Sequence, residues 1–194
     1  MRIGIDISQI VYEGTGVGKY MREMVKEITR QDHKNEFVLF GSSLRKRDVF
    51  FHFYNTLPDH KRVTLRVFPF PPTILSILWN TLHIVPAEWL IGAVDVFWSS
   101  DWTQPPLARA KAVTTIHDLI ALKYPEETHA VTEIHGTSLQ ISPNIVSTHK
   151  RRLSWVKREC SAIFCDSIAT KQDCMELLGI PEQKLHVVYP GYSV

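Results

Sequence analysis

The sequence opens with MRIGIDISQIVYEGTGVGKYMREMVKEITR, residues 1–30, which holds a strand signal, a glycine-rich loop and a helix signal in that order. Residues 2–7 form a short run rich in isoleucine, which predicts a buried strand. Further along, Tyr20, Met24, Val25 and Ile28 recur at helical spacing. A strand, a loop and a helix are the first unit of a parallel α/β sheet.

The rest of the chain alternates between predicted strands and predicted helices. Apolar runs predict further strands at residues 36–40, 63–68, 94–98, 112–116, 162–165 and 185–188. Helical spacing predicts helices at residues 44–56, 73–90, 144–159 and 168–178. Ser167 as N-cap, Gly179 just past the end and Pro181 beyond it delimit the last helix. This alternation predicts a Rossmann-like, doubly wound parallel α/β sheet of about seven strands with helices on both faces.

Length and composition predict one soluble globular domain. The chain has 194 residues, 44% of them hydrophobic and 22% charged, and single domains commonly reach about 200 residues. The net charge of +2 gives no argument for a nucleic-acid partner. Three cysteines without paired spacing predict free thiols in a reducing cytoplasm. Polar residues interrupt every apolar stretch, so we expect neither a signal peptide nor a membrane span.

The glycine-rich loop is the first candidate for ligand binding. It comprises Gly14, Thr15, Gly16, Gly18 and Lys19, and it opens a helix whose free amides and dipole favour a phosphate. A Walker A loop and a dinucleotide fingerprint both fail here, because the required glycine and hydroxyl positions hold other residues. Two interpretations stay open, a phosphate or acceptor loop and a glycine turn that serves only helix packing.

Two more candidates follow predicted strands, where ligands bind in open α/β sheets. His117 and Asp118 leave the strand at residues 112–116, and we expect the imidazole to face the solvent-filled cleft while the carboxylate fixes its tautomer or caps the next turn. Ser99, Asp101 and Trp102 leave the strand at residues 94–98, and hydroxyls with an indole suit a sugar. For each group a purely structural role is the alternative.

The remaining features concern surfaces and loops. A basic cluster at residues 149–152 continues to Lys157 and Arg158, and a second one at residues 45–47 lies beside apolar residues 49–53. A solvated face is one interpretation, and contact with anionic lipid or with a phosphorylated ligand is the other. Residues 124–143 lack periodicity and predict a long loop. His129 and His135 have no partner at metal-ligand spacing, so we expect no metal.

Taken in order, these motifs resemble the large retaining family of GT-B glycosyltransferases that includes bacterial mannosyltransferases and glycogen synthases. The resemblance rests on the opening strand and glycine loop, on Asp95–Ser99, on Thr115–Leu119 with Tyr124–Glu126, on Asp166 with Ser167, and on residues 178–191. It covers nearly the whole chain. One departure is Thr15–Gly16, where many members of the family have two glycines.

The resemblance implies that residues 1–194 are the acceptor-side domain of a two-domain enzyme. A second domain, absent from this chain, would bind the nucleotide and carry paired glutamates. The reaction implied is transfer of a hexose, with retention, from a nucleotide-diphosphate sugar to a saccharide or lipid-linked acceptor in cell-wall or polysaccharide biosynthesis. His117 and Asp118 would be catalytic, and no cofactor or metal is expected. We therefore expect a cytoplasmic protein at the inner face of the membrane; the alternative is a non-catalytic binding module with the same fold.

Overall fold

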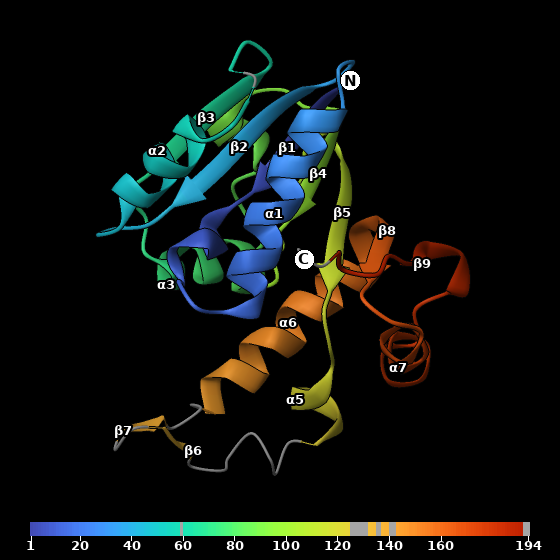
Figure 1. The fold of residues 1–194 in the computed structure, drawn as a ribbon. Helices are drawn as coiled ribbons and strands as arrows, with labels where there is room; N and C mark the ends of the chain where they lie inside the picture. Colours follow the sequence, from blue (N-terminus) through green and yellow to red (C-terminus); the bar gives the residue numbers. More distant parts are fainter. Residues whose placement is uncertain (59, 125–131, 135–136, 140–142, 192–194) are drawn as a thin grey trace.

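A computed structural model of the protein contains one all-parallel sheet of seven strands in the order β3-β2-β1-β4-β5-β8-β9 (Figure 1). It describes residues 1–58, 60–124, 132–134, 137–139 and 143–191. The strands are β1 Arg2–Asp6, β2 Glu36–Ser42, β3 Val63–Phe68, β4 Val96–Ser99, β5 Lys111–Ile116, β8 Cys160–Cys165 and β9 Leu185–Val187. The predicted Rossmann-like α/β sheet is confirmed.

The order of the strands determines where a ligand site can form. The chain runs outward from β1 to β2 and β3, then returns to the other side of β1 and continues through β4, β5, β8 and β9. Ile5 of β1 pairs in register with Leu39 of β2 and Trp98 of β4. The sheet order therefore reverses between β1 and β4, and the crevice beyond their carboxyl ends is where such folds bind ligands.

Helices cover both faces of the sheet because alternate strand residues point to opposite sides. Phe37 and Leu39 of β2 pack on the face covered by α1 and α2, whereas Val38 and Phe40 pack on the face covered by α3, a π-helical turn and α4. The bounds are α1 Gly16–Gln31, α2 Arg47–Asn55, α3 Pro72–Leu75, η2 Ser76–Thr81 (the π-helical turn) and α4 Glu88–Ile91. Both sides of the central strands are thus apolar and closed to water.

A third cluster of buried side chains joins β5, β8 and β9 to helices α6 (Pro143–Glu159) and α7 (Ile168–Leu178), and it includes all three cysteines. The limits predicted for α7 are confirmed. The Ser167 hydroxyl accepts a hydrogen bond from the Thr170 amide at 3.0 Å, and Gly179 ends the helix at φ +60°. Only glycine adopts this left-handed conformation without strain.

The single helix predicted at residues 73–90 is wrong. Backbone φ is positive at His83 and Val85, which separates η2 from α4. Pro86 disfavours a helical conformation at the residue before it, and the Trp79 indole donates a hydrogen bond to the freed Val85 carbonyl at 3.0 Å. The chain therefore turns between η2 and α4, and the apolar residues at helical spacing lie in two short helical segments on either side of this turn.

The loop predicted at residues 124–143 is also wrong in part, because a small antiparallel hairpin lies within it. Its strands are β6 Thr132–Ile134 and β7 Thr137–Leu139. Three short helices complete the described elements, namely η1 Ser8–Val11, α5 Ile120–Lys123 and η4 Glu182–Lys184. Among the described residues, no helix combines the length and apolar character needed to span a bilayer.

Candidate functional site

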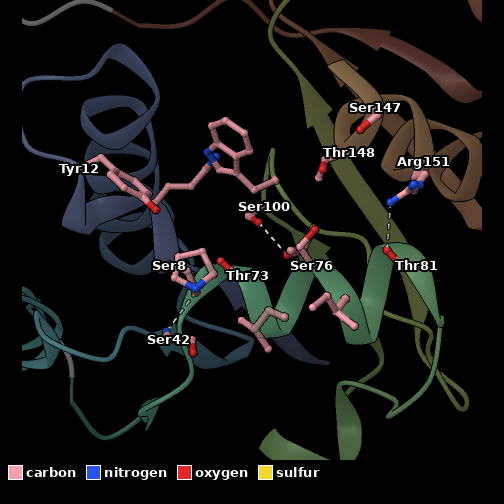
Figure 2. A pocket seen from close by; sticks show the side chains of 16 residues that line it. Ser8, Tyr12, Ser42, Thr73, Ser76, Thr81, Ser100, Ser147, Thr148 and Arg151 are labelled. Carbon is pink, nitrogen blue, oxygen red and sulfur yellow. Dashed lines mark hydrogen bonds between the residues drawn. The ribbon is translucent and has the colours of Figure 1, made fainter. Parts of the chain in front are cut away.

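A pocket of about 650 Å³ opens at the point where the strand order reverses (Figure 2). Its wall contains Ser8 and Gln9 from η1, Ser42 from the end of β2, and Ser100 and Trp102 from the segment after β4. Segments α3, η2 and the amino-terminal part of α6 close the other side. The volume lies in the range of about 300–1,000 Å³ typical of small-molecule sites.

More than half of the side chains that line this pocket are Ser or Thr. Several are held in place by the protein itself. The Ser42 hydroxyl donates to the Phe70 carbonyl oxygen at 2.8 Å, and the Ser100 and Thr103 hydroxyls are 3.2 Å apart. A wall fixed in this way is set before any ligand arrives.

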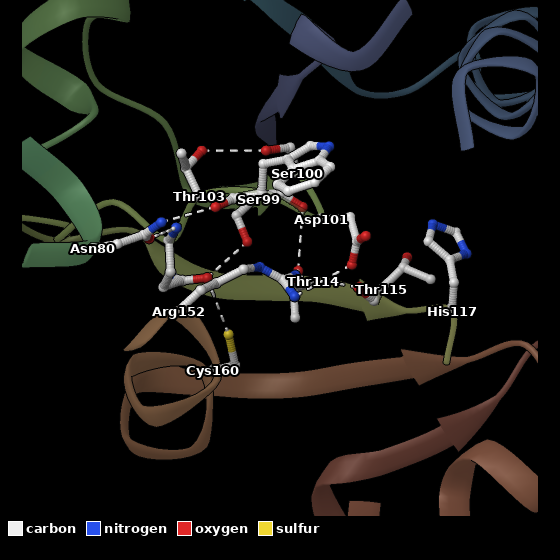
Figure 3. Close-up of polar contacts among 12 residues, drawn as sticks. Asn80, Ser99, Ser100, Asp101, Thr103, Thr114, Thr115, His117, Arg152 and Cys160 are labelled. Atoms are coloured by element: carbon white, nitrogen blue, oxygen red, sulfur yellow. Dashed lines mark hydrogen bonds and ion pairs between the residues drawn. The ribbon is translucent and has the colours of Figure 1, made fainter. Parts of the chain in front are cut away.

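A buried arginine organises the polar groups next to the pocket (Figure 3). The Arg152 side chain is fully buried, and its Nη2 donates to the Thr114 hydroxyl at 2.7 Å and to the Thr115 carbonyl at 3.3 Å. Its Nη1 lies 3.3 Å from Asp101 Oδ1. Burial lowers the pKa of Arg152, while the Asp101 charge acts in the opposite direction. Asp101 is therefore an ion-pair partner that sets the segment after β4 against β5.

His117, at the carboxyl end of β5, is held by a carboxylate from the neighbouring strand. Its Nδ1 lies 2.7 Å from Asp166 Oδ2, and the Tyr20 ring packs edge-on against the imidazole. Burial opposes protonation, but the Asp166 hydrogen bond and the Asp101 and Asp166 charges outweigh it and raise the pKa of His117. The expectation of a solvent-facing imidazole is wrong, because the side chain is only 14% exposed.

Asp118 is exposed and contacts the turn rather than the imidazole. Its Oδ1 accepts a hydrogen bond from the Ile120 amide at 3.0 Å and so holds the turn that leads into α5. This is one of the two roles expected of it, and the carboxylate that binds His117 is Asp166 instead. His149 of α6 lies near the charges of Arg152, Asp101 and Asp118. Burial and the positive charge of Arg152 lower the pKa of His149, against the effect of the two carboxylates.

Asp6, at the end of β1, is a fully buried carboxyl beside the pocket. It accepts from the Ser8 amide at 2.9 Å and from the Thr103 hydroxyl at 3.4 Å. Burial raises the pKa of Asp6, against the lowering effect of these hydrogen bonds. Asp6 therefore fixes two segments of the pocket wall to the end of β1.

The glycine loop lies at the start of α1, outside the wall of the pocket. Thr15 is the N-cap, and its hydroxyl accepts from the Gly18 amide at 3.2 Å. Gly14 and Gly16 are exposed, with open space where a Cβ would be, and Lys19 is exposed as well. A Cβ on Gly18 would come within 2.7 Å of the Tyr12 carbonyl oxygen. Gly18 is thus required for packing, whereas Gly14 and Gly16 leave the backbone open to a ligand.

The candidates after β4 divide between interior and surface. Ser99 is buried, and its hydroxyl donates to Gln104 Oε1 at 2.7 Å, so it belongs to the protein interior. Trp102 is 44% exposed at the pocket and is available to a ligand.

The basic surface predicted on α6 is present, since Lys150, Arg151, Lys157 and Arg158 are all exposed. The second basic patch is not flanked by a continuous apolar surface as expected. Phe50 and Phe53 are buried against the sheet, and Phe51 alone of the three phenylalanines is exposed.

Four residues of this region were not predicted as site residues from the sequence, namely Asp6, Gln9, Arg152 and Asp166. The strand-end rule that selected His117 also applies to Asp6 and Asp166, each of which ends or follows a strand. Arg152 lies on the same helical face as His149 and Val156, at spacings of three and four residues. This spacing could have predicted that its side chain points toward the interior. Gln9 carried no signal, because it lies in a 3-10 turn without periodicity.

No group of three or more His, Cys, Asp or Glu side chains in the described part of the chain could hold a metal ion. His129 and His135 lie outside the described residues.

A parallel sheet with this strand order, a pocket lined by Ser and Thr where the order reverses, and a histidine–carboxylate pair at the same edge of the sheet are features of a Rossmann-like α/β domain. The sequence matches the family described as Glycosyltransferase Family 4 over residues 14–194, and the chain belongs to this family. No curated protein matched the sequence. The protein is therefore a glycosyltransferase-family domain.

Proposed function

We propose that this chain is the acceptor-side domain of an enzyme that moves a hexose from a nucleotide-diphosphate sugar to a hydroxyl of a saccharide or lipid-linked acceptor, with retention. The observation that carries the proposal is the His117–Asp166 pair at the same carboxyl edge of the sheet as a pocket lined by Ser and Thr, in a chain of glycosyltransferase family 4. The pocket would hold the acceptor. The nucleotide would be bound by a second domain outside this chain, and no metal or other cofactor is proposed.

The contacts of His117 indicate how it would act. Because Asp166 engages Nδ1, the ring is fixed and Nε2 is the nitrogen left for a substrate. The raised pKa of His117 favours the imidazolium, whose Nε2 proton would be donated to a sugar hydroxyl or to a phosphate oxygen. Such a group stabilises the negative charge that develops on a leaving diphosphate. Asp118 would contribute by fixing the turn that follows His117.

The glycine loop would approach the donor diphosphate or the acceptor through its backbone. Gly14 and Gly16 present no side chain in this open region, and Thr15 sets the start of α1. Backbone amides at a helix start favour anions. Lys19 is exposed one turn further on and would add a positive charge.

We also propose a cytoplasmic location with contact to an anionic membrane surface. The basic face of α6 lies beside η2, since the Trp155 indole of α6 donates to the Asn80 carbonyl at 3.0 Å. Next to it Ile77, Leu82 and Ile84 are about half-exposed. Basic and apolar side chains together suit the interface of an anionic bilayer. Flotation with phosphatidylglycerol vesicles should recover the protein, and flotation with phosphatidylcholine vesicles should not.

The decisive experiment is a transfer assay of the intact protein with nucleotide-diphosphate hexoses and neutral or lipid-linked acceptors. Transfer with retained anomeric configuration would support the proposal. Absence of transfer with every donor, together with saccharide binding, would instead indicate a non-catalytic module.

Calorimetry of residues 1–194 should show millimolar or weaker binding of nucleotide sugars, because one loop offers few contacts. Micromolar binding would place the donor site in this domain and overturn the two-domain proposal.

A further inference from the structure

Tyr20, near the start of α1, packs against His117 at the carboxyl end of β5. The two ring centroids are 4.9 Å apart and the ring planes lie at 83° to one another. Aromatic rings prefer this edge-to-face arrangement, because the edge of one ring is positive and the face of the other is negative. The contact therefore joins α1 to the histidine, although the two are far apart in the sequence.

The Asp166 hydrogen bond alone does not fix the plane of the imidazole. It engages one ring atom, Nδ1, at 2.7 Å. Hydrogen bonds tolerate donor angles about 30° from linear, so a ring held at one atom can still tilt and change the direction of Nε2. The Thr170 hydroxyl donates to the His117 carbonyl at 3.0 Å, but this bond restrains the backbone and not the ring. Tyr20 supplies a second contact to the imidazole itself.

The backbone that carries Tyr20 is fixed by the turn before it. The Lys19 amide donates to the Thr15 carbonyl at 3.0 Å and closes the first turn of α1. Gly18 lies so close to the preceding segment that a Cβ would come within 2.7 Å of the Tyr12 carbonyl oxygen. The start of α1 is thus packed directly on the segment before it, and the tyrosine ring projects from a fixed point.

The other end of the Tyr20 side chain is held by β5, the strand that leads to His117. Burial raises the pKa of Tyr20, against a hydrogen bond with the Thr115 side chain that lowers it. Thr115 is itself buried, and the Trp98 indole donates to its hydroxyl at 3.2 Å. Figure 3 shows Thr115 and His117 close together on β5. The ring of Tyr20 is therefore held at both ends.

We propose that Tyr20 is a positioning residue for His117, because its ring fixes the tilt of the imidazole and with it the direction of Nε2. Asp166 sets the tautomer, and Tyr20 sets the plane. A functional group must be held within about 0.5 Å and 10–20° of its productive geometry. The kinetic consequence rests on the proposed function, whereas the effect on the imidazole does not.

Nitrogen NMR of the protein with isotope-labelled histidine tests the effect on the imidazole. Above the pH at which His117 titrates, the wild type should show one tautomer, with its proton on Nδ1. Tyr20→Leu should add the Nε2–H tautomer as a minor state of about 10%, since a tilted ring bonds Asp166 less well. Tyr20→Phe keeps the ring and should keep the single tautomer. Tyr20→Met, which fills the same space with a flexible chain, replaces Tyr20→Leu if that variant does not fold.

Transfer kinetics of the intact protein test the consequence for function. Tyr20→Leu should lower kcat about tenfold and change the acceptor KM by less than about twofold, because misalignment of a reacting group affects the transition state more than binding. Tyr20→Phe should restore most of the rate.

Tyr54→Leu is the matched control, because Tyr54 is also a tyrosine packed on a histidine. Its ring centroid lies 4.6 Å from that of His60, and its hydroxyl donates to the Val63 carbonyl at 2.9 Å. This variant should lower Tm, but it should change neither the nitrogen signals of His117 nor kcat.

Three outcomes would overturn the proposal. The first is a mixture of His117 tautomers in the wild type, which needs no variant. The second is a Tyr20→Leu or Tyr20→Met variant with a lowered Tm and unchanged His117 signals, which would make Tyr20 merely structural. The third is altered His117 signals with unchanged kcat. Failure of the proposed function would look different, since the expected NMR result without any sugar transfer would keep the positioning role and reject the enzyme.

Discussion

The carboxyl edge of the sheet carries two neighbouring regions with opposite chemistry. Over β1, β2 and β4 lies the pocket, whose lining residues are mostly Ser and Thr. Beyond β5 and β8 lies a charged cluster, which comprises His117, Asp166, Asp101 and Arg152. The lining of the pocket consists mostly of neutral side chains, whereas the side chains of the cluster are charged and largely buried.

This difference predicts that the pocket and the charged cluster have different roles. Neutral hydroxyls recognise a ligand by shape and hydrogen bonds at little electrostatic cost. Buried charges cost more to maintain, and they are placed where charge develops during a reaction. The two regions adjoin. Asp101 and Arg152 belong to the charged cluster, and their neighbours in the chain, Trp102 and Arg151, line the pocket. Changes in the cluster should therefore have large effects, and changes in the pocket wall small ones.

The largest effect should come from Arg152→Ala, which removes the centre of the charged cluster. Asp101 and Thr114 would lose their buried partner, and the free energy of unfolding should fall by about 3–5 kcal/mol. Urea denaturation measures it. Arg151→Ala, at the exposed neighbouring arginine, is the control and should change stability by less than about 0.5 kcal/mol. Equal effects of the two variants would contradict the importance of the buried ion pair.

His117→Ala should lower the transfer rate of the intact protein by about a hundredfold or more, as expected for loss of a positioned polar group. Because the imidazole is largely buried and bonded to Asp166, the stability cost should be about 1–3 kcal/mol. Rate and melting temperature are measured on the same variant, with exposed His52→Ala as the control. A destabilised variant with near-normal specific activity would make His117 a core residue.

Asp166→Asn should lower the pKa of His117, because it removes the carboxylate that raises it. A group with a raised folded pKa adds stability that is complete below its unfolded pKa of about 6.5 and is lost as pH rises through the folded value. The variant should therefore be less stable than the wild type by about 1.5 kcal/mol near about pH 5–6, where the carboxylate is ionised and the imidazole protonated, with a smaller difference at alkaline pH. NMR titration of the imidazole and denaturation at several pH values measure both effects.

The control for this variant is Asp173→Asn, which breaks an exposed ion pair with Lys123 and leaves the cluster intact. It should not change the titration of His117. If Asp166→Asn also leaves that titration unchanged, Asp166 does not set the charge of the imidazole.

The smallest effect should come from the pocket wall. Thr73→Val keeps the shape and removes one hydroxyl from an exposed position, so acceptor binding should weaken about threefold and stability should stay within about 0.5 kcal/mol. Thr64→Val on β3, also exposed, is the control outside the pocket. A loss of acceptor binding by about a hundredfold, as large as the loss of transfer rate expected for His117→Ala, would remove the distinction between the two regions.

The sheet could be predicted because each strand and long helix carries its own periodic signal. Residues 63–68 and 168–178 begin and end as expected, since a run of strand residues and a capped helix are local features. The segment at residues 73–90 was predicted wrongly from its apolar spacing, because that spacing does not reveal the break that Pro86 signals and the Trp79 indole stabilises.

The sequence alone therefore determined the Rossmann-like fold and the strand ends where the site lies, because both follow from periodicity and from the geometry of parallel sheets. Only the tertiary structure decided which side chains meet there. His117 is bonded to Asp166, which is 49 residues away in the chain, and not to the adjacent Asp118. Neighbouring parallel strands end side by side whatever their separation in sequence, while consecutive residues point in different directions. The partners of a side chain at this edge of the sheet are for this reason set by packing, and local sequence does not reveal them.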